Sequence, residues 1–271
     1  MNSIIYRSAP AVAAFIAAIA LALPAFAQCR QSITFPVAGG ALSAMMFVPA
    51  TTPAPAVVVL HTKTFTNTFE PADEKFAEAL AGEGFVAVAL NYLDVVGPKL
   101  WSPAIDQQLS QVVGLLGKRP EVGGKPVGMV GFALGAHAII VSALDPAVKA
   151  VVVYYGDYDL RRAKGMKYPP GVKMPIEVVA GVNAPVLMLE GESNNENPIA
   201  IARDMQAALK TAGKTVELVV YPSAHQRFDR GAPARMSGER SPDGYIYRYD
   251  DAAAKDAWKR TLAWLRANLG S

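Results

Sequence analysis

The sequence predicts an α/β protein in which a mostly parallel sheet is covered by helices on both faces. Short apolar runs typical of strands alternate with amphipathic helical segments along most of the chain. Some of these runs, such as Ala56–Leu60, are apolar at every position, as expected of strands buried on both faces. The chain has 271 residues and no internal repeat or linker-like tract, so we expect a single domain over residues 28–271.

The first part of this domain is dominated by strands. Two short runs on either side of a Gly-Gly pair predict opening strands over Ile33–Val37 and Ala44–Val48. The apolar run Ala56–Leu60 predicts a buried strand. A helix near Pro71–Gly82 separates it from another strand over Phe85–Leu90.

The rest of the domain continues the alternation of strand and helix. Further expected strands are Val127–Val130, Ala150–Tyr154, Pro185–Leu189 and Val216–Tyr221. Further expected helices are Ser102–Leu116, the small-residue segment Ala133–Leu144, Ile199–Ala212 and Ala252–Leu269. Ligands of such sheets bind beyond the carboxyl ends of the strands, so the residues that follow the strands are the first candidates for a site.

Composition and charge exclude several classes of protein. Hydrophobic residues make up 52% of the chain and charged residues 18%, which excludes a disordered chain or a coiled coil. The net charge of +3 is too small to favour a nucleic-acid partner. With three His and one Cys, neither a disulfide framework nor a cysteine zinc site is available, and no His pair has helical metal-site spacing. We expect no metal, and no organic cofactor either, because no phosphate-binding glycine loop opens the fold.

The first 27 residues have the pattern of a bacterial export signal. A positively charged start is followed by the apolar run Ala9–Leu23 and by Ala25-Phe26-Ala27, the small-x-small pattern of a cleavage site. The run is shorter than the roughly 20 apolar residues that a membrane span needs, which disfavours an anchor. We therefore expect the mature protein to begin near Gln28, to have no membrane partner, and to be periplasmic or secreted.

The segment Gly131-Phe132-Ala133-Leu134-Gly135 lies between an expected strand and a helix of small residues. In α/β-hydrolases this context is the nucleophile elbow, Gly-x-nucleophile-x-Gly, in which the glycines allow a sharp turn. The backbone N–H group after the nucleophile donates to the oxyanion, which here assigns that role to Leu134.

Several segments in order resemble the dienelactone hydrolase family across nearly the whole mature chain. AVVVLHTKTF resembles the family's strand and oxyanion loop, GFALGA its elbow, and AVVVYYG its next strand. PVLMLEGESNNENP resembles the turn that carries the acid, and VELVVYPSAHQRF the strand and loop that deliver the histidine. The resemblance implies an α/β-hydrolase fold and a small ester or lactone as substrate, with the elbow, acid and histidine in the family's order.

The catalytic positions that this resemblance assigns are Ala133, Asn194 and His225. Ala133 stands at the nucleophile position, where the family has Cys or Ser, and a methyl group cannot attack a carbonyl. Asn194 stands at the acid position and cannot stabilise an imidazolium by charge, although a shifted alignment makes Glu192 or Glu196 the acid. Only His225 matches. Natural loss of the nucleophile, an engineered replacement and a different chemistry all remain open for Ala133.

The expected ligand-binding residues follow the strands. His61 ends a strand at the carboxyl edge, Thr62 and Lys63 are candidates for a backbone N–H group in the oxyanion site beside Leu134, and Trp101 lies in a loop where lids occur in the family. His137, just after the elbow, is interpreted as a core histidine with a partner. Asp157 and Asp159 beside two arginines are expected to form a solvated loop.

Two long segments, 161–175 and 226–250, look like insertions relative to a compact hydrolase, and both are candidates to cap the site. Two functions follow from these residues. Either the chain is degenerate at the nucleophile and binds a small ester, lactone or carboxylate, or it is an active ester or lactone hydrolase that uses His225 with water or with another nucleophile. The oligomeric state and the ligand are not fixed by the sequence.

Overall fold

The computed structural model of the chain describes residues 29–62, 70–93, 103–164, 171–233 and 236–270. The expected export signal lies outside these residues, and so do Lys63 and Trp101. Within the described residues, no helix combines the length and the apolar character needed to cross a bilayer.

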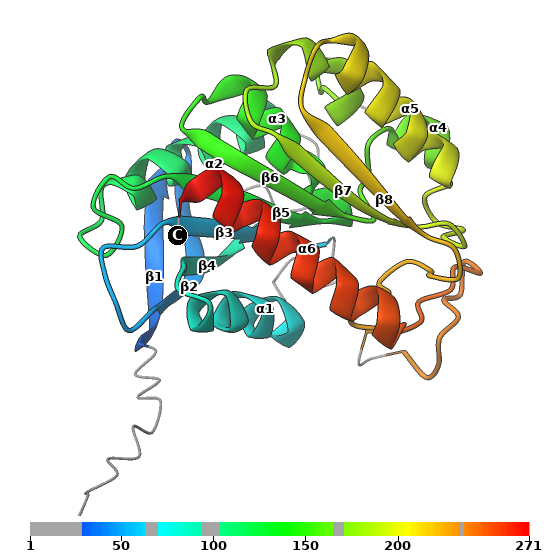
Figure 1. The fold of residues 1–271 in the computed structure, drawn as a ribbon, viewed down its shortest axis with the longest axis horizontal. Coiled ribbons are helices and arrows are strands. Elements are labelled where there is room, and N and C mark those ends of the chain that lie inside the picture. The colour runs from blue at the N-terminus through cyan, green and yellow to red at the C-terminus, as the bar shows by residue number, and fades with distance from the viewer. Residues whose placement is uncertain (1–28, 63–69, 94–102, 165–170, 234–235, 271) are drawn as a thin grey trace, which may run out of the picture.

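An eight-stranded sheet in the order β1-β2-β4-β3-β5-β6-β7-β8 forms the centre of the molecule (Figure 1). Strand β2 pairs with β1 on one side and with β4 on the other, both in antiparallel orientation, while β3 to β8 run parallel. The expected α/β class with a mostly parallel sheet is confirmed. The strands are β1 (Cys29–Val37), β2 (Gly40–Val48), β3 (Ala56–Leu60), β4 (Val86–Asn91), β5 (Val127–Phe132), β6 (Val148–Tyr154), β7 (Val186–Gly191) and β8 (Val216–Tyr221).

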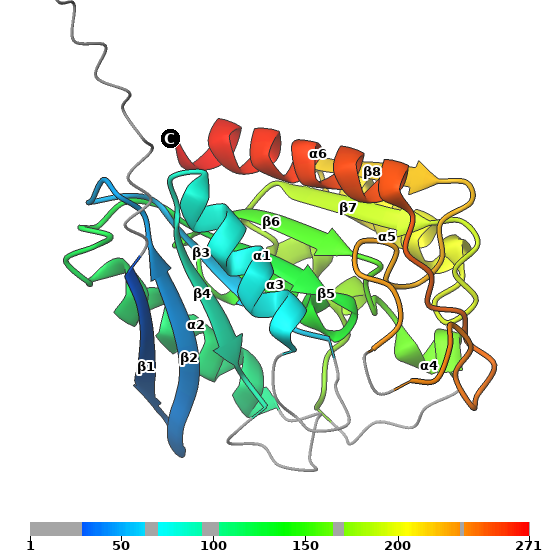
Figure 2. The ribbon, with the colours of Figure 1, turned by 90° about the horizontal axis from the view of Figure 1, so that it is seen from below.

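Helices cover both faces of this sheet (Figures 1 and 2). On one face α1 packs on β2, β3 and β4, and α6 packs on β5, β6 and β7; on the other face lie α2, α3 and α5. The α-helices are α1 (Pro71–Gly82), α2 (Pro103–Gly117), α3 (His137–Leu144), α4 (Leu160–Lys164), α5 (Ile199–Thr211) and α6 (Asp251–Leu269).

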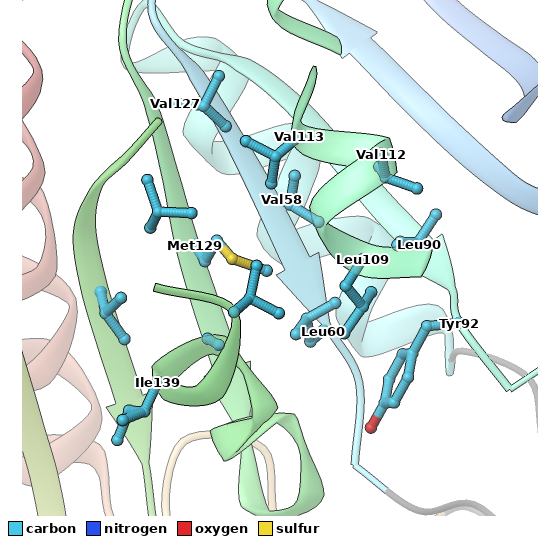
Figure 3. Packing of buried hydrophobic residues seen from close by; sticks show 14 of the residues in the cluster. Val58, Leu60, Leu90, Tyr92, Leu109, Val112, Val113, Val127, Met129 and Ile139 are labelled. Atoms are coloured by element: carbon cyan, nitrogen blue, oxygen red, sulfur yellow. The ribbon is translucent and has the colours of Figure 1, made fainter. Parts of the chain in front are cut away.

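Each face of the sheet has its own apolar core, because side chains of a strand alternate between the two faces. On the α2 side, Val58 and Leu60 of β3 and Met129 of β5 pack against Leu109 and neighbouring residues of α2 (Figure 3). These four side chains are at most 1% exposed. Full burial of a side chain of this size stabilises the fold by about 1.5–3 kcal/mol relative to exposure.

The structure differs most from the sequence prediction at the first two strands and at the helix after β5. The first strand begins at Cys29 rather than Ile33, and the second at Gly40 rather than Ala44, because all nine residues of each pair with the other at the edge of the sheet. The predicted helix Ala133–Leu144 begins instead as a 3₁₀ turn over Ala133–Ala136, and the α-helix starts only at His137. The tight turn is a consequence of the elbow described below.

The parallel strands bring the candidate residues to one edge of the sheet. β3, β5, β6, β7 and β8 all end at the same side, and the loops that follow them carry the predicted site. In Figure 2 the arrowheads of β5 and β6 point toward the end of the molecule where the orange segment after β8 lies. Asp250 caps the N-terminus of α6 by accepting a hydrogen bond from the Ala253 N–H group, which ends this long segment.

Candidate functional site

The turn after β5 is the sharpest feature of the site. Ala133 has φ +49°, a left-handed conformation that residues other than glycine rarely adopt. A Cβ atom on Gly131 would lie 2.0 Å from the carbonyl oxygen of Gly135, and one on Gly135 would lie 2.6 Å from that of Leu60. Both positions therefore require glycine, and the backbone geometry is that of a strand–turn–helix elbow with Ala133 at its apex.

The apex is buried and carries no reactive group. Ala133 is 3% exposed, and its side chain is a methyl group. Leu134, next in the chain, lies in the first turn of the 3₁₀ segment, where backbone N–H groups lack intrahelical acceptors. The N–H group of Asp157, in the loop after β6, donates to the Ala133 carbonyl oxygen at 3.0 Å and ties the two loops together.

His61 and Thr62 follow β3 at the same edge. His61 is fully buried, and its Nδ1 atom lies 2.6 Å from the carbonyl oxygen of Thr62, which is half-buried. The Tyr92 hydroxyl donates to the His61 carbonyl oxygen at 2.8 Å, and the two rings lie 4.6 Å apart. His61 and Thr62 thus lie at the carboxyl edge of the sheet, and the His61 side chain packs against Tyr92.

His225 lies three residues after the proline that follows β8 and is half-buried. Its backbone is held by the loop after β7: the Ser193 N–H group donates to the Ala224 carbonyl oxygen at 3.0 Å, and a Cβ atom on Gly191 would lie 2.3 Å from that oxygen. The Nδ1 atom of His225 is buried, and no residue in the described ranges forms a hydrogen bond with it.

Asn194, in the turn after β7, has its side chain fully engaged elsewhere. Its Nδ2 group donates to Oε1 of Gln226 at 2.6 Å. Its Oδ1 atom accepts from the N–H groups of Glu196 at 3.0 Å and Asn197 at 3.1 Å. Asn194 is 4% exposed and Gln226 is 2% exposed. Asn194 is therefore paired with Gln226, and this partner was not anticipated from the sequence.

The two alternative acids have other partners. Glu192 is exposed and forms an ion pair with Arg203 at 3.1 Å. Glu196 is half-buried and accepts a hydrogen bond from the Tyr247 side chain, whose pKa is raised mainly by burial and then by Glu196.

Part of the long segment after β8 covers the turn of Asn194. Asn195 holds it through two hydrogen bonds of 3.0 Å, from its Nδ2 group to the Gly244 carbonyl oxygen and from the Ile246 N–H group to its Oδ1 atom. An isolated parallel bridge pairs Gln226 with Tyr247. Segment 239–249 is thereby fastened over the turn. The first long segment, 161–175, differs, since its described residue Ala163 packs against the core on the α2 side of the sheet.

The loop after β6 corrects one expectation. Asp157 and Asp159 were expected to be solvated, but they are only 9% and 7% exposed. Asp157 accepts a hydrogen bond from Nδ2 of Asn197 at 2.6 Å, and Asp159 accepts one from Nε of Arg161 at 3.2 Å. The reason is a second left-handed residue, Tyr155, with φ +41°, which turns the loop back over the sheet edge.

Glu190, at the end of β7, is a buried acid that sequence reasoning missed. It is 2% exposed, and its Oε1 atom accepts hydrogen bonds from the Gly156 N–H group at 3.0 Å and the Tyr158 hydroxyl at 2.7 Å. Its pKa is raised to about 8, mainly by burial and also by the nearby Asp157, while the two hydrogen bonds act in the opposite direction. An acid inside an otherwise apolar strand is the signal that the sequence offered.

Two buried ion pairs connect the loop after β8 to the start of α1. Arg227, itself at φ +62°, contacts Glu70 at 2.6 Å. Arg230 contacts Asp73 at 2.6 Å, and its guanidinium lies 3.7 Å from the centre of the Phe132 ring, next to the apex of the elbow. Both arginines are thus already neutralised by carboxylates of the protein.

His137 has the role that the sequence indicated. It is 4% exposed, and its Nδ1 atom lies 2.6 Å from Oδ1 of Asp106, the buried acid in the first turn of α2. The interpretation of a core histidine with a partner is confirmed. Among the described residues, no group of three or more His, Cys, Asp or Glu side chains is arranged to hold a metal ion.

A model of the dienelactone hydrolase family matches residues 42–269. Over 141 residues, 52% of this chain and 42% of the relative, the chain is 36% identical to a "Putative carboxymethylenebutenolidase" of Methylorubrum extorquens. A protein of the same description from Escherichia coli K12 is 30% identical over 139 residues, 51% of this chain and 45% of the relative. The matched stretches span less than half the length of these curated relatives.

Solved structures show the same architecture. The crystal structure of a "Putative Dienelactone Hydrolase" from Klebsiella pneumoniae superposes with a TM-score of 0.71 at 24% identity, covering 88% of this chain and 98% of that one. A likeness at this identity concerns the fold, and it confirms the expected α/β-hydrolase fold.

Proposed function

Because the chain belongs to the dienelactone hydrolase family, we propose that it binds a small ester, lactone or carboxylate at the carboxyl edge of its sheet without attacking it. The site lies among the loops after β3, β5, β6, β7 and β8. Its ligand class is that of the family, and the covalent step is absent.

One observation carries this proposal: a methyl group stands at the apex of the elbow. The left-handed Ala133 and the two glycines that a Cβ atom would disrupt give the backbone of a nucleophile elbow. A covalent hydrolase needs an oxygen or sulfur at this position. In subtilisin, loss of the nucleophile costs about 10⁶ in kcat, and the activity that remains comes from the oxyanion site and substrate binding.

Turnover of p-nitrophenyl acetate and of a small lactone by the purified mature chain tests the catalytic half of the proposal. We expect the rate to equal that of buffer, and the His225→Ala variant to be indistinguishable from the parent. A parent that turns over either ester, and loses this activity in His225→Ala, would instead be a hydrolase that activates water through His225.

Titration by NMR with phenyl acetate, dihydrocoumarin and benzoate tests the binding half. We expect one of these probes to shift the backbone amides of Leu134 and Gly135 at the elbow. The amides of Gly123 and Gly124, in the turn before β5 at the opposite edge, are the internal control. Shifts confined to the opposite edge, or none with any probe, would contradict binding at this site.

A further inference from the structure

We propose that Gln226, rather than His225, occupies the place from which the family's histidine acts, and that its amide offers a hydrogen-bond donor to the carbonyl of a bound ester or lactone. This inference rests on the proposed function for its ligand, and on the geometry of the loops after β7 and β8 for its residue. The positions of the nucleophile, the acid and the base are then occupied by Ala133, Asn194 and Gln226. None of these side chains can attack a carbonyl or ionise.

The first argument is the partner of the acid turn. In a hydrolase triad the residue on this turn hydrogen-bonds the base, and that bond orients the base. Here Asn194 stands on the turn, and its Nδ2 group donates to Gln226 Oε1 at 2.6 Å. The acid-to-base connection is therefore present as an amide–amide pair, displaced by one residue along the chain from the position that the resemblance assigned.

The second argument is the state of His225. The ring nitrogen that an acid would orient is Nδ1, and that atom is buried without a hydrogen-bond partner among the described residues. A base in this condition has no group to fix its tautomer or to stabilise its charged form. Gln226 is the better buried of the two, since it is 2% exposed while His225 is half-buried.

The third argument is that Gln226 is held in one orientation. Its backbone pairs with Tyr247 of the segment 239–249, and the next residue, Arg227, is left-handed and tied to Glu70. Because Asn194 Nδ2 is a donor, it selects the oxygen of the Gln226 amide. The opposite end of the amide is then the Nε2 group, a donor for which no acceptor is recorded within the described ranges.

The chemical consequence is a donor where the family has a proton acceptor. An amide N–H group hydrogen-bonds a carbonyl or ring oxygen of an intact ester but cannot remove a proton from water. Ligand binding through this donor is independent of pH between about 5 and 9, because neither amide ionises in that range.

The decisive experiment places a thiol at the apex and uses it to locate the base. The Ala133→Cys variant is prepared in a Cys29→Ser background, since Cys29 is exposed, and its alkylation by iodoacetamide is followed against pH. Without further substitutions, the introduced thiol should have a pKa at or above the ordinary value of about 8.5. With Asn194→Asp and Gln226→His added, its pKa should fall by at least about one unit, as thiols paired with imidazolium do.

The same thiol distinguishes the two candidate bases. Adding His225→Ala to the Asn194→Asp and Gln226→His variant should leave the lowered thiol pKa in place. If the thiol pKa is already lowered with Gln226 intact and rises on His225→Ala, the proposal is overturned. It is equally overturned if Gln226→His, in a chain whose melting temperature shows that it is folded, leaves the thiol unchanged.

The donor role is tested in the parent chain with dihydrocoumarin. Gln226→Ala should weaken binding by about 2- to 10-fold, the effect of one neutral hydrogen bond, and the affinity of the parent should be flat from pH 5.5 to 8.5. The matched control is Gln107→Ala, at an exposed glutamine on α2, and it should leave the affinity unchanged. An affinity that changes across this pH range would overturn the donor role. Absence of any binding would defeat the proposed function alone, because the thiol experiment still locates the base position.

Discussion

A left-handed alanine at the elbow has an energetic consequence at the scale of one residue. For a residue with a Cβ atom the left-handed conformation costs about 1–2 kcal/mol, whereas glycine adopts it freely. Where a nucleophile stands at such a turn, the strain serves to expose a reactive atom. Ala133, with φ +49°, carries the same strain and no reactive atom.

Relief of this strain predicts an unusual response to glycine. Ala133→Gly should leave the free energy of unfolding unchanged or raise it by up to about 1 kcal/mol, since lost strain outweighs the added chain entropy. Ala136→Gly is the matched control, because Ala136 is equally buried but has φ −57°. It should lower stability by about 0.5–1 kcal/mol. Urea unfolding of both variants measures these changes. Equal losses in the free energy of unfolding would mean that the turn is unstrained.

At the scale of residues, the elbow was predicted from the sequence, but the hydrogen bond between Asn194 and Gln226 was not. Spacing of Gly131 and Gly135 after an apolar strand is enough to place Ala133, because only a tight turn needs both glycines. The partner of Asn194 depends on which of two adjacent side chains the loop after β8 turns inward. That choice is set by Tyr247, by the left-handed Arg227 and by ion pairs to α1, none of which a local pattern reveals.

At the scale of elements, the loop after β8 and the start of α1 act as one unit. Arg227 joins Glu70, and Arg230 joins Asp73, with the same spacing on both segments. The Arg230 and Asp73 side chains are only 5% and 1% exposed. Buried charges of this kind stabilise a structure only as a complete set, because removal of one partner leaves the other without compensation.

Removal of one guanidinium should therefore be costly. Arg230→Met should lower the free energy of unfolding by about 3–5 kcal/mol, because it leaves the buried Asp73 and the largely buried Asp229 carboxylates without their ion-pair partner. Adding Asp73→Asn should recover part of the loss. Arg203→Met, which breaks the exposed pair with Glu192, is the control and should cost no more than about 1 kcal/mol. Similar losses from Arg230→Met and Arg203→Met in urea unfolding would show that the buried pairs do not hold the loop.

The strands were easier to predict than the helix that follows the elbow. Runs such as Ala56–Leu60 are apolar throughout because both faces of the sheet are covered, and this pattern survives in the sequence. Val216–Tyr221 was equally clear although β8 lies at the edge. The 3₁₀ turn at Ala133 was not anticipated, since small residues favour a helix and only the tertiary contact of Gly135 with Leu60 tightens its start.

At the scale of the whole molecule, Glu190 makes stability depend on pH. Its pKa is raised from an ordinary value of 4.5 to about 8, so the folded chain keeps a proton that the unfolded chain has released. The contribution of this group is fully present below pH 4.5 and is lost as the pH rises to about 8. The slope is about 1.4 kcal/mol per pH unit in that interval.

Glu190→Gln should remove this slope while keeping the oxygen that accepts from Gly156 and Tyr158. Relative to the variant, the parent should lose stability between pH 5 and 8 and run parallel to it above pH 8. Glu217→Gln, an exposed acid on neighbouring β8, is the control for a general effect of charge. Parallel stability curves of the parent and Glu190→Gln from pH 5 to 8 would contradict the buried neutral acid.

The position of α6 determines when the molecule can fold during its synthesis. This last helix covers β5, β6 and β7, and a Cβ atom on Gly128 of β5 would lie only 3.0 Å from the Leu269 side chain. A nascent chain still attached to the ribosome has the central strands before it has their cover. The apolar face of those strands stays open to water and to other chains until α6 emerges. Folding of the centre is thus deferred until α6 has left the ribosome, and the incomplete chain must be protected from aggregation until then.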